Sequence, residues 1–419
     1  DYVGKERRCD SGGEPVMPLY RDKVARELER SKAEFSDPED RKRAVEAYRT
    51  ASEDIHERST KGEIEVRLGE YEQPGALPTG EFDEFDDLCV PFGQTWESHE
   101  AVNEWARECL EDRAVIAADG SQIDPVREFD RPVGLVQALW LVNHHSNKRE
   151  FERDVEVEIL TPEDLLMDDS DSGYMRVDTE EVAVARFELE MQVLGELIEE
   201  YSDVEPTPVA MYDGPLTLSF AQMFDQERRD RYAEALSKVL AASECHEVPF
   251  VGFTSGSKAG DIGTMLDRLG EISVSQKVQD FRMLLPYVEN WGDRSQLYVC
   301  RRDSSLDWLS TSYRGETYDF SEDIAFCYMN TGSGFALDRV DMPRWIIDSG
   351  FSEEVLRVVR AEAAVGRGYP EILSAADTDA VISREDREYF LDMYQDFAEE
   401  NDIQLRWMDK ALSKKRRRR

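Results

Sequence analysis

The chain has 419 residues, of which 91 are Asp or Glu and 51 are Lys or Arg, and its formal net charge is −40. At roughly 100–200 residues per domain, this length predicts two or three folded units. The negative charge excludes the usual class of strongly basic nucleic-acid-binding domain. Apolar residues make up 40% of the chain and are spread along its whole length, which excludes an intrinsically disordered protein.

The basic residues are mainly arginine, since only 12 of the 51 are lysine. An acidic surface of this extent repels itself at low salt. In molar salt the Debye length falls to about 3 Å, and this repulsion almost disappears. The composition is therefore typical of a protein from a halophile that accumulates salt in its cytoplasm. An acidic protein that binds basic partners is the alternative interpretation.

No apolar run approaches the roughly 20 residues that a membrane-spanning helix needs, and no signal-peptide pattern is visible. We therefore expect a cytoplasmic location. The chain starts at Asp1 rather than at a methionine, so we expect a few residues to precede it. The six cysteines lie far apart and form no C-x-x-C pair, which predicts reduced thiols rather than a disulfide framework or a zinc ribbon.

In chain order, residues 18–60 are predicted to form two charged helices separated by Ser36-Asp37-Pro38, and residues 74–91 an acidic connector. A helix over about 97–112 follows. The remaining apolar patterns predict strands at 114–119, 134–143, 155–160, 209–213, 249–254, 296–301, 325–329 and 335–340, and helices at 178–201, 218–243, 351–364, 371–382 and 384–400. This order of elements predicts an α/β fold with a mixed sheet flanked by helices.

Two of the predicted strands end in the same way, with an aspartate followed by glycine. The first runs into Asp119-Gly120 and the second into Asp213-Gly214. Ligands of open α/β sheets gather at the carboxyl ends of strands, and glycine lets a ligand approach the backbone closely. Both aspartates are therefore candidate site residues. The alternative is that each Asp-Gly pair only forms a turn.

Two further carboxylates lie on faces of predicted helices that should be apolar. Glu190 occupies the centre of a stripe that otherwise contains apolar side chains, where a carboxylate is unfavourable unless it has a partner or a metal. Arg186 lies one turn earlier and could be that partner. Asp377 shares a helix face with Leu373 and Ala376, although an exposed helix would explain it equally well.

Four carboxylates on one α/β sheet suggest a site for hard cations such as Mg²⁺ or Mn²⁺, which prefer oxygen ligands. Two such ions about 3.5–4 Å apart can promote an in-line displacement at a phosphodiester. In that chemistry one ion activates water and the other neutralises the leaving oxygen. The protein then supplies position and charge, and no covalent intermediate is required.

Several short motifs occur together in an order that resembles the archaeal NurA nucleases. They are Ala118-Asp119-Gly120-Ser121, Arg186-x-x-x-Glu190, Tyr212-Asp213-Gly214-Pro215-Leu216, Lys258, Arg339-Val340-Asp341-Met342-Pro343 and Gly368-Tyr369-Pro370 ahead of the Ala376 helix. The resemblance covers about residues 95–385. It implies an RNase H-like nuclease domain over residues 96–400, preceded by a helical region with the connector over residues 1–95. A strand or tail with a basic end is expected over residues 401–419.

The resemblance also implies an activity: Mn²⁺-dependent, or alternatively Mg²⁺-dependent, DNA hydrolysis in DNA-end resection. The expected partners are DNA, a second copy of the chain and a hexameric ATPase of the HerA type. Asp119, Glu190, Asp213 and Asp377 would bind the metal, and Lys258 would contact phosphate or position the nucleophile.

One position departs from the family pattern, because Asp377 stands where NurA proteins usually have histidine. An aspartate can still bind a hard cation, but it cannot act as a neutral imidazole. This difference keeps open a second function, an RNase H-like interaction subunit that regulates the ATPase and has little activity of its own. A metal-dependent phosphatase for small esters also fits four carboxylates, but it does not fit the order of the motifs.

Overall fold

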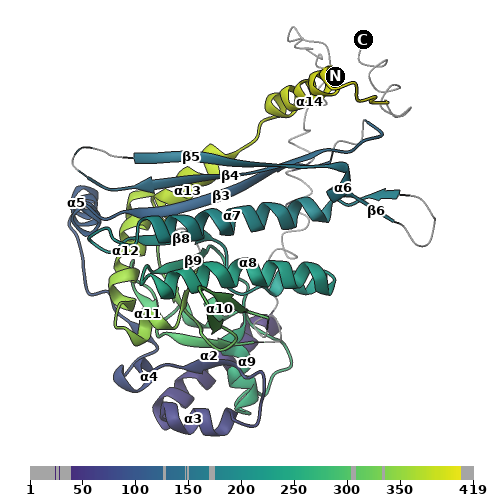
Figure 1. The fold of residues 1–419 in the computed structure, drawn as a ribbon. Coiled ribbons are helices and arrows are strands. Elements are labelled where there is room, and N and C mark those ends of the chain that lie inside the picture. Colours follow the sequence, from purple (N-terminus) through teal and green to yellow (C-terminus); the bar gives the residue numbers. More distant parts are fainter. Residues whose placement is uncertain are drawn as a thin grey trace, which may run out of the picture.

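The computed structural model describes residues 24, 28, 39–125, 129–146, 148, 151–168, 175–302, 308–332 and 336–406. Its centre is a large mixed β-sheet with helices on both faces (Figure 1), as the sequence predicts. The main path through this sheet runs β1-β11-β14-β15-β9-β8-β3-β4-β5, and β2 and β10 pair beside it.

The strands of the sheet are β1 (Gly75–Pro78), β2 (Cys89–Val90), β3 (Val115–Ile123), β4 (Gly134–Asn143), β5 (Phe151–Leu160), β8 (Val209–Asp213), β9 (Phe250–Thr254), β10 (Arg294–Ser295), β11 (Tyr298–Arg301), β14 (Ile324–Met329) and β15 (Asp338–Pro343). Two small hairpins lie outside it: β6 (Leu166–Asp168) with β7 (Met175–Val177), and β12 (Ser310–Tyr313) with β13 (Glu316–Asp319).

The helices are α2 (Glu39–Arg58), α3 (Lys61–Leu68), α4 (Glu81–Glu84), α5 (His99–Leu110), α6 (Pro162–Leu165), α7 (Glu180–Glu200), the 3₁₀ helix η1 (Ser219–Met223), α8 (Gln226–Cys245), α9 (Asp261–Arg268), α10 (Asp280–Leu284), α11 (Trp345–Asp348), α12 (Ser352–Val365), α13 (Glu371–Ala380) and α14 (Arg384–Glu400). Within the described ranges, no helix has the length and apolar character needed to cross a membrane.

Five strands of the sheet form an RNase H-like core. β3, β4 and β5 are consecutive and antiparallel, and β8 and β9 then add to the other side of β3 in parallel. The resulting order β5-β4-β3-β8-β9 is that of an RNase H-like sheet, so the expected core is present. It places the carboxyl ends of β3, β8 and β9 at one edge, where the candidate residues were expected to lie.

The sheet continues beyond this core with antiparallel strands. β15 pairs with β9, and β14, β11 and β1 follow in turn. β1 and β2 come from the segment that was expected to be a connector. Their register with β11 and β10 shows that residues before position 95 hydrogen-bond into the same sheet as the later strands. Such two- to four-residue strands are defined by distant partners, which a local pattern does not reveal.

Two separate hydrophobic cores cover the two faces of the sheet, because side chains alternate along each strand. Ala118 belongs to the core beneath α7 and α8, which lie side by side in Figure 1. Ala117 belongs to the opposite core, beneath α5, α12 and α13. The same alternation directs Asp119 toward the α13 face and Gly120 toward the α7 face.

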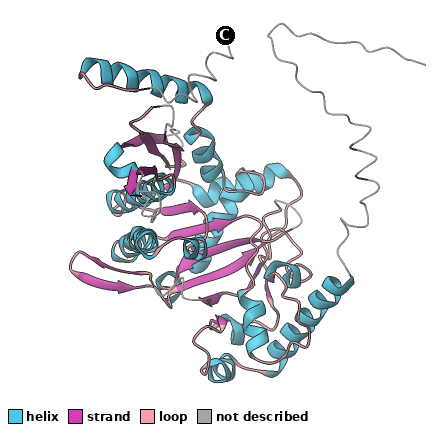
Figure 2. Cartoon of the chain, turned by 90° about the vertical axis from the view of Figure 1, so that its right-hand side faces the viewer, coloured by secondary structure: helices cyan, strands magenta, loops and turns pink. Residues whose placement is uncertain are grey.

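Most of the predicted elements are confirmed, several with identical bounds, such as β4, β8 and α14. α2 begins directly after Pro38, but the helix expected before it lies almost entirely outside the described residues. Of the expected C-terminal strand or tail, residues 401–406 form no strand, and residues 407–419 lie outside the described residues. Figure 2 shows α14 extending away from the body of the fold.

Candidate functional site

The candidate site lies where β3 and β8 stop pairing. β3 pairs with β8 only as far as Ala117 and Met211, although it remains paired with β4 to Ile123. Asp119 and Gly120 follow this last pair on β3, and Asp213 is the last residue of β8. The main chain is therefore open between the two aspartates, and side chains from both faces of the sheet can meet there.

The α7 face contributes Glu190, whose side chain is 4% exposed. A Cβ atom added to Gly120 would lie 3.0 Å from Glu190 Oε2 and 2.8 Å from Arg186 Cγ, so only glycine leaves room for these side chains. Glu190 makes no hydrogen bond or ion pair with any other described residue. A buried carboxylate without a partner is strongly unfavourable in the absence of a compensating cation.

Arg186 is not the ion-pair partner of Glu190, which was the alternative left open by the sequence. Its Nη1 donates a hydrogen bond to the carbonyl oxygen of Gly120 at 3.0 Å, and its Nε is buried without a partner. The guanidinium is nevertheless close enough to lower the pKa values of Glu190 and Asp119. Arg186 therefore ties α7 to β3 and moderates the negative charge of the site.

The pKa values show that the acidic side chains act on one another. Burial, together with Asp119 and Asp213, raises the pKa of Glu190 to about 8 against the influence of Arg186. Burial, together with Asp377 and Asp213, raises the pKa of Asp119 to about 6. The four predicted carboxylates thus form one electrostatic cluster, although they come from β3, α7, β8 and α13.

Tyr369 completes this cluster and was not singled out from the sequence as a site residue. Burial and a hydrogen-bond interaction with Asp213 raise its pKa, and Asp377 and Asp119 contribute. Its ring also packs edge-on against Phe253 of β9 at 5.3 Å. Tyr369 directly precedes Pro370 and α13, the helix that packs against β3, β4 and β8. Only the Gly368-Tyr369-Pro370 motif pointed to this position.

Lys258 lies at the same edge of the sheet, in the loop between β9 and α9. Its side chain is exposed and has no hydrogen-bond or ion-pair partner among the described residues. The structure thus leaves Lys258 available to an external anion, but it does not bring Lys258 into contact with the carboxylates.

The chemistry of the cluster fits a hard divalent cation: the donors are carboxylates, and burial together with the neighbouring carboxylates raises the pKa values of two of them. These carboxylates do not form a complete metal coordination sphere in the structure. Across the described residues, no three His, Cys, Asp or Glu side chains are arranged so that they could hold a metal ion. A cation would have to draw these side chains closer together.

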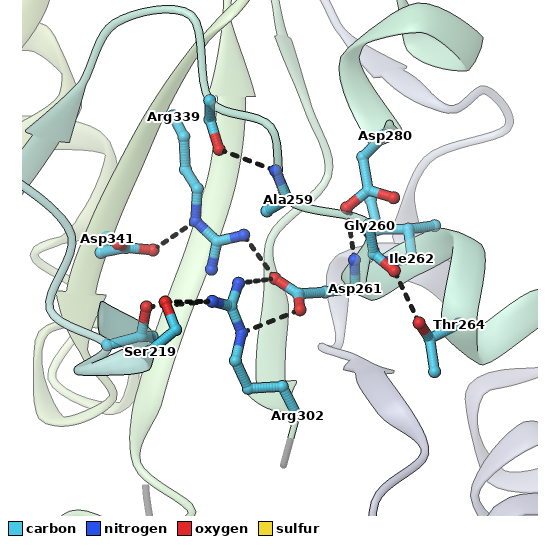
Figure 3. A network of polar contacts seen from close by, with 12 residues as sticks. Ser219, Ala259, Gly260, Asp261, Ile262, Thr264, Asp280, Arg302, Arg339 and Asp341 are labelled. Atoms are coloured by element: carbon cyan, nitrogen blue, oxygen red, sulfur yellow. Dashed lines mark hydrogen bonds and ion pairs between the residues drawn. The ribbon is translucent and has the colours of Figure 1, made fainter. Parts of the chain in front are cut away.

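A buried ionic network supports the loop that follows Asp213 (Figure 3). Arg339 of β15 donates through Nε to Asp341 at 2.7 Å and through Nη1 to Asp261 at 2.5 Å. Its guanidinium also stacks 3.8 Å from the centre of the Phe326 ring. The second carboxylate oxygen of Asp341 accepts a hydrogen bond from the Leu216 N–H at 3.2 Å, so the network holds the loop after β8 directly.

A second arginine extends the same network to the loop. Arg302 donates to both carboxylate oxygens of Asp261, and its Nη1 donates to Thr217 Oγ1 and Ser219 Oγ at 3.3 Å (Figure 3). The Arg339-x-Asp341 motif thus has a structural role that the sequence did not reveal: it fixes the loop that follows Asp213.

The chain is similar to one known domain family and to solved structures of it. The NurA domain matches residues 113–382, and no curated protein matches the chain. Two solved structures are distantly similar. A NurA solved with manganese has 10% identity and a TM-score of 0.35 and covers 71% of this chain and 93% of its own. A NurA bound to dAMP and manganese has 11% identity and a TM-score of 0.37 and covers 67% and 87%. Because the domain match spans well over half of the 419 residues and confirms the resemblance of the motifs, the chain belongs to the NurA family.

Proposed function

We propose that this protein is a metal-dependent DNA nuclease that hydrolyses phosphodiester bonds with Mn²⁺, or alternatively Mg²⁺. The observation that carries the proposal is the carboxylate cluster at the open end of β3 and β8, in a chain of the NurA family. The NurA proteins solved with manganese and dAMP agree with this choice of cation and substrate class. We place the activity in the cytoplasm, in DNA-end resection.

Each residue has a distinct role in this proposal. Asp119, Glu190, Asp213 and Asp377 would hold one or two cations, which when bound activate water and neutralise the leaving oxygen. Tyr369 and the Arg339 network hold Asp213 in place. Arg186 fixes the backbone at Gly120, and Lys258 contacts the phosphate of the substrate. The burial of Glu190 keeps bulk water away from the α7 side of the cluster.

Glu190→Gln tests whether this residue binds metal. The change keeps the shape of the side chain and removes its charge, so Mn²⁺ should raise the melting temperature of the variant much less than that of the wild type. Thermal unfolding with and without Mn²⁺ measures the difference. Arg186→Met is the comparison: it should retain the larger part of the stabilisation by Mn²⁺. A greater loss in Arg186→Met than in Glu190→Gln would contradict the assignment of Glu190.

Two observations favour a second candidate function. The described residues contain no preformed set of metal ligands, and Asp377 is an exposed aspartate on α13. In this alternative the protein is an interaction subunit that regulates a HerA-type ATPase. Incubating linear DNA or a small phosphomonoester with Mn²⁺ in molar KCl separates the candidates. Degradation of DNA alone supports the nuclease, hydrolysis of the ester indicates a phosphatase, and inactivity on both favours the interaction subunit.

The proposed partners are DNA, a HerA-type hexameric ATPase and a second copy of the chain. A second copy fits the surface between α14 and the outer strand β5, where a groove of about 820 Å³ is lined mainly by apolar side chains. Tyr389, Met393 and Phe397 form an exposed stripe at every fourth residue of α14, and Val157 and Ile159 of β5 are also exposed. Because each copy carries both the stripe and the strand surface, two copies could cover both by the same contact.

Met393→Asp is expected to shift the protein from dimer to monomer, since it places a charge in the centre of this stripe. Light scattering after gel filtration in molar KCl measures the mass. Glu388→Ala, on the opposite side of α14, is the control and should leave the mass unchanged. A Met393→Asp protein that remains dimeric at the same concentrations would place the dimer contact elsewhere.

A further inference from the structure

A hollow of about 970 Å³ lies between α5, the end of β14 and the segment that joins α12 to α13. Trp96, Trp291, His99, Asn103 and Arg367 are among its lining residues. Arg367 and Gly368 belong to the wall of the hollow, and the next residue is Tyr369, which interacts with Asp213. Residues 367–369 therefore lead directly from the wall of the hollow to the carboxylate cluster, with no helix or strand between them.

We infer that this aromatic hollow binds a nucleobase of single-stranded DNA whose backbone continues to the carboxylate cluster. The inference rests on the proposed nuclease function and adds a site for the part of the strand that is not cleaved. Bases bind without sequence preference by stacking on aromatic side chains, and Trp96 and Trp291 both line this hollow.

The aromatic side chains are held as a rigid group. Trp96 lies between Phe92, Trp105 and Trp291, with ring centroids 5.9, 5.1 and 5.5 Å away. Trp291 is fixed further, because its Nε1 donates to the Thr331 carbonyl oxygen at 2.7 Å, and Thr331 Oγ1 donates to the Gly368 carbonyl oxygen at 2.6 Å. A hydrogen-bonded path therefore runs from the aromatic wall to the residue before Tyr369.

The charge of the hollow fits DNA, because its lining contains Arg367 and no acidic residue. Asp and Glu account for 91 of 419 residues, so twelve lining positions would be expected to include two or three of them. None of the twelve lining residues is Asp or Glu. Glu97, Glu100 and Glu104 are neighbours of the lining residues Trp96, His99 and Asn103 in the sequence, but they do not line the hollow. The groove between α7 and α8 shows the opposite composition, with Glu188, Glu196, Glu199, Glu227, Asp230 and Glu234 among its lining residues. A DNA strand would be repelled there.

The polar groups around the hollow are available to a ligand. His99, Asn103 and Arg367 are exposed, and their side chains have no hydrogen-bond or ion-pair partner within the described part of the chain. Arg367 adopts a φ of 59°, directly after α12, where glycine or asparagine would be less strained. An unpaired arginine in such a position can meet a phosphate, and His99 and Asn103 can hydrogen-bond to the edge of a base.

The test compares two DNA strands on two forms of the protein. A labelled single strand of about ten thymidine nucleotides, and the same strand with abasic sites in place of its bases, are titrated with the full chain in molar KCl without divalent cations. Phosphate attraction is weak in this salt, so stacking dominates the difference between the strands. The wild type should bind the base-bearing strand about tenfold more tightly than the abasic strand.

Trp96→Leu should remove this preference and bind both strands equally weakly, whereas Trp96→Phe should keep most of it. Trp308→Leu is the control, because Trp308 lies outside the hollow beneath Arg229, and it should discriminate as the wild type does. An unfolded Trp96→Leu would also lose the preference, so its circular dichroism and melting temperature are compared with those of the wild type. Loss of the preference in a Trp96→Leu protein that remains folded identifies stacking.

Undiminished base preference in Trp96→Leu, or no preference in the wild type, would overturn the inference. Because these titrations contain no divalent cation, they do not depend on cleavage. A wild type that shows no base preference but degrades DNA with Mn²⁺ would leave the nuclease proposal intact. A wild type that neither binds nor degrades DNA would contradict both.

Discussion

Asp119→Asn is expected to reduce Mn²⁺-dependent DNA cleavage by at least about a hundredfold, while the fold remains intact. Asp119 is the carboxylate that the other three surround, from β8, from α7 and from α13. Removing its charge deletes a proposed metal ligand just beyond the point where β3 stops pairing with β8. Cleavage of linear DNA under single-turnover conditions measures the loss.

Asp124→Asn is the matched control, since Asp124 follows β3 and is exposed. It should cleave DNA at the wild-type rate. Asp213→Asn should behave as Asp119→Asn does, because Asp213 ends the neighbouring strand. Cleavage by Asp119→Asn at more than a few per cent of the control would show that the site has been assigned wrongly.

Asp119→Asn is also expected to change the thermal stability of the protein in the absence of metal. The folded protein raises the pKa of Asp119 from 3.8 to about 6. A carboxyl with a raised pKa favours the folded state below its unfolded pKa, and this contribution is lost as the pH rises through the folded value. Asp119→Asn should therefore melt at a higher temperature than the wild type at pH 8, and this gain should disappear near pH 4.

Arg339→Met is expected to lower the free energy of unfolding by roughly 3–5 kcal/mol, which is typical when one partner of a buried ion pair is removed. The guanidinium is 1% exposed and lies between Asp341, which is fully buried, and Asp261, which is 5% exposed. Methionine fills much of the volume but removes the ion-pair partner of Asp341 and leaves Asp261 paired with Arg302 alone among the described residues. Urea denaturation in molar KCl measures the change.

Arg384→Met provides the comparison on the surface. Arg384 pairs with Glu388 one turn along α14, and both side chains are largely exposed. Such pairs contribute only about 0.3–0.5 kcal/mol, and molar salt weakens them further. If the two substitutions lower stability by the same amount, the buried network does not have the role inferred for it. Arg339→Met should also slow cleavage, because the loop after Asp213 loses its support.

The sequence by itself determined most of the RNase H-like core. Strands β3, β4, β5, β8 and β9 each consist of a run of strand-forming residues bounded by turns, so a local pattern is sufficient to recognise them. It also made Asp119 and Asp213 candidate site residues, because Asp-Gly at a strand end is a local signal. Glu190 was recognisable because a carboxylate interrupts an apolar helical stripe, and its burial in α7 is confirmed.

The tertiary structure decided what these residues touch. Whether Arg186 pairs with Glu190 or with the Gly120 carbonyl depends on how α7 packs against β3, and residues 186 and 120 lie 66 positions apart. Tyr369 reaches Asp213, and Arg339 reaches Asp261, only because strands and loops distant in sequence are adjacent in the sheet. The aromatic hollow likewise combines Trp96 with Trp291 and Arg367. These contacts are long-range, so no periodicity or spacing in the chain could specify them.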